Sequence, residues 1–313
     1  MEYAIEAQAL AKRYRSQNGR MALSGLDLAV PAGEMFALVG PDGAGKTTTL
    51  RILSTVMSQT SGEASVSGFD VRRDADVARK HIGYMPQNFS LYPDLTVLEN
   101  LRFFADVQGM KPERRAIRIP EMLAFTRLTP FQSRRSANLS GGMKKKLALA
   151  CALLHEPQVL LLDEPSTGVD PVSRRELWQI LSNVVQQGVT IVVSTPYMDE
   201  AERCTSVGML YKGSLLTSGA PQALIDSVPY AIIEVKAKPR KEMRRIVMET
   251  KGISSWRPVG DRLRLAAVEP TAVIESLRDQ FQGEGLEVRV LRETRPGMED
   301  VFVHLVEVQE GQP

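Results

Sequence analysis

The amino-acid sequence predicts an α/β fold with a mixed, largely parallel sheet, followed by a small α+β domain. Up to about residue 228, short apolar runs typical of buried strands alternate with segments of helical periodicity, the pattern of a parallel sheet covered by helices on both faces. The first two expected strands alternate apolar and polar residues, as antiparallel strands do. After Pro229 the composition changes, and the remaining segments follow the order β-α-β-β-α-β. We therefore predict domains at 1–228 and 229–313.

The N-terminal strands are expected at 3–10 and 23–30, with Tyr14 and a turn-rich segment at 16–19 between them. An aromatic side chain in this position can stack on a nucleotide base through its π-face. The alternative is that Tyr14 is a half-buried residue at the end of a strand.

A glycine-rich loop follows the apolar run 35–39 and leads into a segment with helical spacing at 48–57. The loop reads Gly40-Pro41-Asp42-Gly43-Ala44-Gly45-Lys46-Thr47-Thr48. Its glycines allow backbone N–H groups to turn inward, Lys46 can reach the β- and γ-phosphates, and the Thr47 hydroxyl can hold Mg²⁺. The N-terminus of the following helix also favours an anion. The stretch therefore predicts a phosphate-binding loop.

A helical insertion is expected between sheet elements at 88–138, after a buried strand that ends at Gln87. Its first helix, at 96–109, begins with Thr96 and Glu99 at the spacing of a capping box. Its second helix, at 113–128, contains Pro120, which is expected to kink or split it.

Ser140, Gly141 and Gly142 introduce a further helix that runs to about residue 155 and has a basic first turn. Basic residues at a helix N-terminus oppose the macrodipole, so this helix start is electrostatically suited to an anion. The alternative is that Ser140 is a plain N-cap.

Two carboxylates, Asp163 and Glu164, follow the continuous apolar strand 159–162. The carboxyl end of a buried parallel strand is where ligands bind in α/β sheets. We expect Asp163 to hold Mg²⁺ through water and Glu164 to orient or deprotonate the attacking water. The alternative, a solvated acidic turn, does not account for the phosphate loop upstream.

Bulk properties exclude several classes of protein. The 313 residues are 43% apolar and 24% charged with a net charge of +2, so nothing indicates a nucleic-acid partner. No run approaches the roughly 18 apolar residues of a membrane span, and the N-terminus lacks a signal-peptide pattern, so we expect neither a spanning nor a secreted chain. Cys151 and Cys204 lack ligand-like spacing and are expected to be free, buried thiols.

Over about residues 3–228, the sequence resembles the nucleotide-binding subunits of ATP-binding cassette (ABC) transporters. Six parts occur in the family order: the phosphate loop 40–48, Gln87, the signature segment 139–143, the Asp163-Glu164 pair, the loop ending at Asp170, and the switch region 194–200. The resemblance implies the ABC-type fold of a P-loop NTPase that binds ATP and Mg²⁺. It implies that Lys46, Gln87 and Glu164 are catalytic and that Tyr14 stacks on adenine. The expected metal ligands are Thr47, Gln87 and Asp163.

The resemblance also implies partners. Two such subunits, identical or different, pack head to tail, so that ATP lies between the phosphate loop of one and Ser140-Gly141-Gly142 of the other, and Asp170 is expected among the nucleotide-binding residues. Gln87 would sense both Mg²⁺ and a membrane partner docked on the helical insertion. Separate transmembrane permease subunits would place the chain on the cytoplasmic face of the cell membrane as a peripheral protein.

One residue departs from the family pattern. Where the family usually has a switch histidine that contacts the γ-phosphate, this chain has Pro196. We expect Pro196 in the first turn of a helix, where proline is well tolerated. It supplies no hydrogen-bond donor, so the site is expected to bind ATP but to hydrolyse it slowly.

The C-terminal segment matches the element order of a ferredoxin-like domain and is expected to be regulatory or dimer-stabilising. Its end, residues 296–303, is similar to the tails of type-two ABC exporter subunits. The sequence therefore favours an ATPase subunit of an exporter. Two alternatives are a non-transport ABC protein of translation or DNA repair and a regulatory subunit that binds ATP without turnover.

Overall fold

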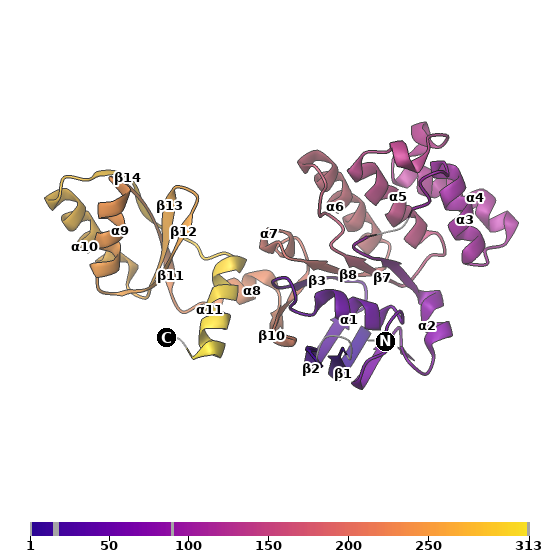
Figure 1. Cartoon of the computed structure of the whole chain (residues 1–313), viewed down its shortest axis with the longest axis horizontal. Coiled ribbons are helices and arrows are strands. Elements are labelled where there is room, and N and C mark those ends of the chain that lie inside the picture. The colour runs from indigo at the N-terminus through magenta and orange to yellow at the C-terminus, as the bar shows by residue number, and fades with distance from the viewer. Residues whose placement is uncertain (1, 15–18, 89–90, 312–313) are drawn as a thin grey trace. The chain divides into compact units, whose positions relative to one another are not determined.

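The structure, a computed structural model, describes residues 2–14, 19–88 and 91–311 and divides into two compact units, 1–219 and 220–313 (Figure 1). The division falls earlier than the expected boundary after residue 228, because α8 (Pro221–Asp226) packs against α11 (Met298–Glu310) of the second unit. The expected segment 16–18 lies outside the described residues.

The first unit begins with an antiparallel sheet, as the alternating pattern predicted. Its strands lie in the order β2-β1-β4-β5. Their bounds are Met21–Pro31, Tyr3–Arg13, Ser61–Val66 and Phe69–Asp70. One face of this sheet is buried, so the apolar residues of β1 and β2 recur at alternate positions along much of each strand.

A second, six-stranded sheet has the order β10-β9-β3-β8-β7-β6 and is parallel except for the β9–β10 hairpin. Its strands are Ser214–Gly219, Ser206–Tyr211, Met35–Val39, Thr190–Thr195, Val159–Asp163 and Ile82–Met85. Strands β3, β7 and β8 are buried at every residue, which explains their unbroken apolar sequences. In this register Val39 pairs with Thr195 and Asp163 with Ser194, so the three strands end at one edge of the sheet.

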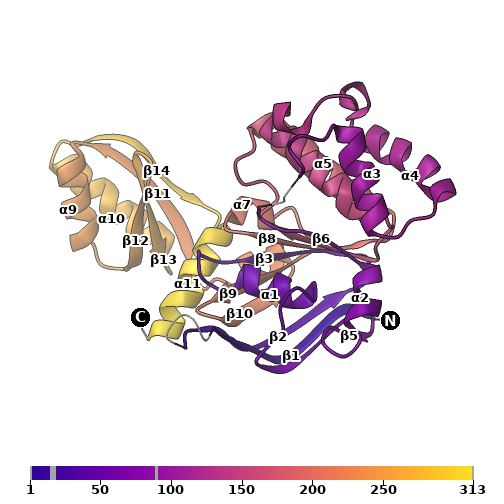
Figure 2. The same ribbon diagram turned by 45° about the vertical axis from the view of Figure 1, so that its right-hand side comes forward.

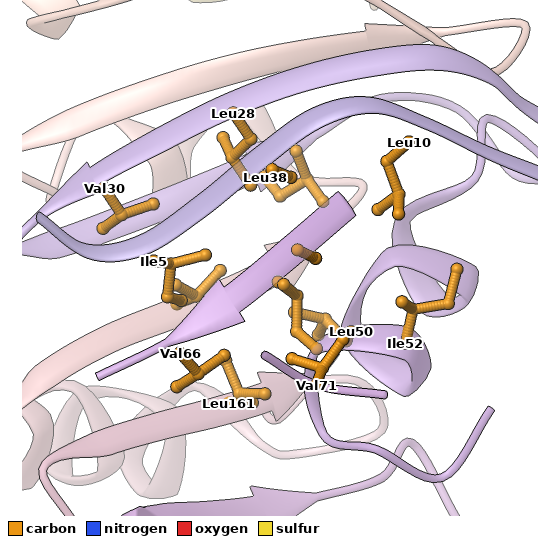
Figure 3. Packing of buried hydrophobic residues seen from close by; sticks show 14 of the residues in the cluster. Ile5, Leu10, Leu28, Val30, Leu38, Leu50, Ile52, Val66, Val71 and Leu161 are labelled. Atoms are coloured by element: carbon orange, nitrogen blue, oxygen red, sulfur yellow. The ribbon is translucent and has the colours of Figure 1, made fainter. Parts of the chain in front are cut away.

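Helix α1 (Lys46–Leu53) lies between the two sheets and contacts strands of both. Figure 3 shows the core at this place, where Ile5 and Leu28 of the antiparallel sheet lie near Leu38 and Leu50. Figure 2 shows α1 with β1 and β2 on one side of the parallel sheet and α3, α4 and α5 on the other. The phosphate loop is therefore anchored to the most buried part of this unit.

The helical insertion contains α3 (Val97–Val107) and α4 (Pro112–Phe125), and α5 (Gly141–Leu153) follows it. The capping box is present: the Thr96 N–H donates to Glu99 Oε2 (2.8 Å), and the Glu99 N–H donates to Thr96 Oγ1 (3.2 Å). The predicted split at Pro120 is wrong, because α4 runs through it. Buried residues on both sides of Pro120 hold the helix together although the proline lacks an N–H.

The remaining elements of the first unit are short or support the sheet. Helix α2 precedes β6, two 3₁₀ turns follow α4, α6 lies between β7 and β8, and α7 follows β8. Their bounds are Ala75–His81, Thr129–Phe131, Ser136–Asn138, Pro171–Gln186 and Met198–Ala201. Cys151 and Cys204 are free and buried, as expected. In the described ranges, no helix is long and apolar enough to cross a membrane.

The second unit has the predicted order β-α-β-β-α-β in an antiparallel sheet with strand order β12-β13-β11-β14. Its elements are Ala231–Lys238, Arg240–Glu249, Ile253–Val259, Arg262–Ala267, Pro270–Gly283 and Glu287–Thr294, which are β11, α9, β12, β13, α10 and β14. Helices α9 and α10 lie side by side against the sheet and share its core (Figure 1). This arrangement is ferredoxin-like.

Candidate active site

The glycines of the phosphate loop are required by its backbone. Gly40, Gly43 and Gly45 have φ angles of +155°, +77° and +114°, a region that side chains strongly disfavour. A Cβ on Gly40 would lie 2.1 Å from the Leu210 carbonyl oxygen, and one on Gly45 would lie 2.7 Å from that of Ala22. No side chain caps the N-terminus of α1 at Gly45. The N–H groups of this first turn are therefore suited to an anion.

Lys46, the first residue of α1, is buried beneath this loop. Its ammonium donates to the carbonyl oxygens of Gly40 (2.7 Å) and Pro41 (3.1 Å). Burial lowers the pKa of Lys46, while the charges of Glu164, Asp42 and Asp163 oppose that shift. A phosphate at the loop would stabilise this desolvated ammonium directly.

Asp163 is fully buried at the end of β7 and has one oxygen left over. Its Oδ1 accepts from the hydroxyls of Thr47 (3.0 Å) and Ser194 (2.5 Å), whereas its Oδ2 is buried and has no hydrogen-bond partner among the described residues. A buried carboxylate oxygen without a donor requires a cation or a water. Mg²⁺ typically takes one or two protein ligands together with waters and phosphate oxygens. Thr47 and Asp163 therefore fit a magnesium ion.

Glu164 lies at the open end of the same strand and is paired with Gln87. Its Oε2 accepts from the Gln87 side-chain amide (2.8 Å) and from the Thr167 hydroxyl (3.2 Å). Its backbone has a φ of +48°, which is strained for a residue with a side chain, and its N–H donates to the oxygens of Ser194 (3.1 Å). Strand β8 thus holds the turn that directs this carboxylate.

These residues surround a cavity of about 360 Å³. Its predicted lining residues are Tyr14, Asp42, Gly43, Gly45, Lys46, Thr47, Thr48, Gln87 and Glu164. Gly40, Pro41 and Ala44 belong to the same loop but do not line the cavity, and Asp163 lies beneath Thr47. The cavity brings together residues from β1, α1, β6 and β7 that are far apart in sequence.

Tyr14 combines both interpretations of its sequence position. It follows β1, is half-buried and lines the cavity. Its hydroxyl lies 3.2 Å from Thr48 Oγ1, so the ring is anchored to the first turn of α1. Sequence reasoning missed Arg20 and Ala22, which also line the cavity. The Tyr14 N–H donates to the Arg20 carbonyl (3.0 Å), so a basic residue across the turn from Tyr14 was the available signal.

The signature segment and Asp170 do not line this cavity. Ser140 is the N-cap of α5, and its hydroxyl accepts from the Met143 N–H (3.3 Å). Asp170 is the N-cap of α6 and accepts from the N–H groups of Val172 and Ser173, which lower the pKa of its carboxyl. Within one chain, both residues therefore act as caps, and any role at a nucleotide requires a second subunit.

The comparison with known proteins identifies the family. The sequence matches the family described as "ABC transporter" over residues 23–167. It is 34% identical over 308 residues to the daunorubicin resistance ATP-binding protein DrrA2 of Streptomyces coeruleorubidus, covering 97% of this chain and 95% of that protein. The chain belongs to the ATP-binding proteins of ABC transporters. This confirms the expected family.

Other relatives of this ABC protein include exporter components. It is 41% identical to the Nod factor export ATP-binding protein I of Paraburkholderia xenovorans (strain LB400), with coverage of 72% of this chain and 74% of the relative. It is 40% identical over 305 residues to the probable multidrug ABC transporter ATP-binding protein YbhF of Escherichia coli (strain K12). That match covers 96% of this chain but 52% of YbhF, so the chain spans about half the length of that relative.

Solved structures confirm the expected fold of the cassette. An ATP-binding subunit of an ABC transporter superimposes with a TM-score of 0.64 at 31% identity, covering 71% of this chain and 92% of that one. A dimeric ATP-binding cassette in a post-hydrolysis state with ADP and Pi superimposes with a TM-score of 0.63 at 28% identity, covering 69% and 98%.

The switch region of this ABC protein differs from the expectation in one detail. Pro196 precedes α7 by two residues and is not in its first turn, because Tyr197, with φ −93° and ψ 115°, is still extended. The nearby Glu200 is fully buried and accepts from Arg174 Nε (2.7 Å) and Thr195 Oγ1 (2.6 Å). Glu200 therefore holds the end of β8 against α6.

Proposed function

We propose that this chain is the ATP-hydrolysing subunit that energises an ABC exporter. ATP binds at the phosphate loop of one cassette and is covered by Ser140, Gly141 and Gly142 of a second, identical or different, cassette. Closing and opening of the pair drive separate transmembrane subunits from the cytoplasmic face of the membrane. The export functions printed in the names of several relatives support the direction of transport.

The observation that carries this proposal is the convergence of Lys46, Thr47, Gln87 and Glu164 on one cavity. The Lys46 ammonium neutralises charge on the phosphates, and the free N–H groups of α1 bind their oxygens. Thr47 and Asp163 would hold Mg²⁺, which when bound supplies further positive charge at the phosphates. Glu164 orients the attacking water and accepts its proton, while Gln87 fixes the position of the carboxylate.

A second cassette completes the site because the terminal phosphate remains exposed on the first. The start of α5 offers backbone N–H groups and the positive end of a helix dipole to that phosphate. Hydrolysis removes the group that both cassettes hold, so the closed pair loses stability and opens. ATP thus controls a two-state element.

The chain's own site is proposed to turn over slowly because Pro196 offers no donor to the developing charge on the phosphate. The side chain of proline cannot replace an imidazole N–H, and its backbone nitrogen also lacks a hydrogen. The Glu164 carboxylate is retained, so we propose slow hydrolysis rather than none.

Substitution Glu164→Gln tests the proposal. It keeps the shape of the side chain but removes the proton acceptor, so phosphate release should fall about a hundred- to ten-thousand-fold. ATP should still bind and should accumulate a dimer measurable by light scattering. Glu113→Gln, in the exposed first turn of α4, is the control and should leave both unchanged. Unchanged hydrolysis by Glu164→Gln would contradict the assigned chemistry.

Co-purification tests the transport part separately. We expect transmembrane subunits to co-purify with the chain from detergent-solubilised membranes. Recovery with ribosomes or DNA instead would favour a non-transport ABC protein. A complete lack of single-turnover hydrolysis would favour a regulatory subunit.

A further inference from the structure

We propose that Lys145 is a positioning residue that couples the phosphate-loop site of its own cassette to the helix start presented to a second cassette. The proposal rests on the function proposed above. Lys145 lies on α5, one turn after Ser140, Gly141 and Gly142. Its ammonium donates to the backbone carbonyl of Gln87 (3.1 Å) and lies 3.5 Å from that of Glu164.

The two acceptors belong to the residues whose side chains form the catalytic pair. The Gln87 amide donates to the Glu164 carboxylate at 2.8 Å, and Lys145 contacts the main chain of both. Gln87 follows β6 and Glu164 follows β7, so the lysine connects the ends of two neighbouring strands to α5. A change in either strand end therefore acts directly on this helix.

The main chain at Glu164 needs support from outside its own strand. Its φ of +48° is an unfavourable conformation for a glutamate, and such residues persist where their surroundings hold them in place. Ser194 holds the N–H side of this residue, and Lys145 lies at its carbonyl side. Lys145 thus supplies the second of two contacts that define how the carboxylate is presented.

The cavities on either side of the glutamine turn give the same connection. Gln87 lines the phosphate-loop cavity and also a second cavity of about 420 Å³, which Gly141 and Lys145 line as well. On its other side, the start of α5 packs on α6, because Gly142 lies against Ser173 and Lys146 pairs with Glu176. The start of α5 is therefore held between α6 and the catalytic edge, with Lys145 on the catalytic side.

The consequence is a defined orientation of the Ser-Gly-Gly helix start when the site is assembled. Loss of Lys145 leaves the phosphate loop intact, because none of the loop residues contacts it in the described structure. It releases α5 from the catalytic edge, so closure with a second cassette must also order this helix. Dimer formation should weaken while ATP binding to the single cassette is retained.

The test compares Lys145→Gln with the wild-type chain at a saturating concentration of a non-hydrolysable imido analogue of ATP and Mg²⁺. Hydrogen bonds from a charged donor are among the stronger ones in proteins, so half-maximal dimerisation should require about tenfold more protein or greater. Affinity of the monomer for a fluorescent ATP analogue should change by less than about twofold. Light scattering and fluorescence anisotropy provide the two readouts.

Conservative and matched variants separate positioning from loss of charge or stability. Lys145→Arg retains donors of similar reach and should dimerise within about threefold of wild type. Lys111→Gln removes an exposed charge from the helical insertion and should behave as wild type. Equal dimerisation of Lys145→Gln and wild type would overturn the proposal, as would unfolding of both Lys145→Gln and Lys145→Met. Failure of the wild type to dimerise would instead refute the proposed function.

Discussion

The two glycine-containing helix starts of the cassette, at α1 and at α5, look alike in sequence and are built differently. At α1, the glycines adopt backbone angles that other residues disfavour, and no side chain caps the helix. At α5, Ser140 caps the helix with its own hydroxyl. Gly142 is needed there for another reason, because a Cβ would lie 2.4 Å from that of Ser173.

The difference shows which half of a nucleotide site one chain can complete. The start of α1 has Lys46, Thr47 and Glu164 around a single cavity. The start of α5 lines a separate cavity, and Gln87 is the residue common to both. A glycine at α1 therefore serves ligand binding, whereas Gly142 at α5 serves packing that presents Ser140 and Gly141 at the surface.

Substitution Pro196→His should have the largest effect and sharpens the comparison on the α1 side. If the site lacks one donor to the transition state, a histidine should raise ATP turnover about a hundred- to a thousandfold, or roughly 3–4 kcal/mol. The measurement is steady-state phosphate release. ATP affinity is the control and should stay within about threefold, since the phosphate loop is unchanged. Equal turnover of the two proteins would remove the explanation of slow hydrolysis.

Substitution Glu200→Gln should have the next largest effect and tests the support of α6, on which α5 packs. The fully buried carboxylate accepts from Arg174 and Thr195, so its neutralisation leaves the guanidinium without its buried partner. Arg174 keeps Asp199 at 2.9 Å, so we expect a loss of about 3 kcal/mol in the free energy of unfolding, the low end for a buried pair. Urea denaturation measures this. Asp199→Asn, at the exposed end of the same network, should cost under about 1 kcal/mol.

Much of the fold and of the phosphate-loop side was predictable because its determinants are local. The order of glycines in 40–48, the Thr96–Glu99 capping box and the buried runs of β3 and β7 each specify their own backbone geometry. The tail's β-α-β-β-α-β order likewise follows from short-range periodicity. The unbroken α4 was not predictable, since its stability across Pro120 comes from tertiary burial.

The pairings that make the site depend on the order of strands in the sheet, which local patterns do not reveal. Gln87 meets Glu164 because β6 and β7 are neighbours, and Ser194 meets Asp163 because β7 and β8 are neighbours. Lys145 reaches both strand ends only in this arrangement. Arg20 enters the cavity through the chain reversal after Tyr14.

Substitution Gly142→Ala should have a smaller effect and separates packing from ligand access at α5. The added methyl would overlap Ser173, so overpacking should cost about 1–3 kcal/mol of stability. At Gly141 a Cβ would lie 3.3 Å from the Gly168 carbonyl oxygen, so Gly141→Ala should cost less. Thermal unfolding compares the two. The double variant Gly142→Ala/Ser173→Gly should recover most of the loss, and failure to recover it would disprove the packing role.

The smallest expected effect is a pH dependence at the far end of α5, where His155 Nε2 lies 3.0 Å from the Ile82 carbonyl oxygen of β6. Burial lowers the pKa of His155 below 6.5, and the nearby His81 adds to this, while the hydrogen bond opposes it. The native state then binds fewer protons than the unfolded chain below about pH 6.5. The free energy of unfolding should therefore fall with decreasing pH, by at most about 1.4 kcal/mol per pH unit. Full stability should be present above that pH.

Urea titrations at pH 7.5, 6.5 and 5.5 measure this slope. His155→Gln keeps a donor for the Ile82 carbonyl but does not titrate, so its slope should be shallower than that of the wild type. His304→Gln, in the C-terminal unit, should keep the wild-type slope. Parallel slopes for the wild type and His155→Gln would mean that the end of α5 is wet enough to protonate without cost, and that the rigid connection of this helix to β6 is absent.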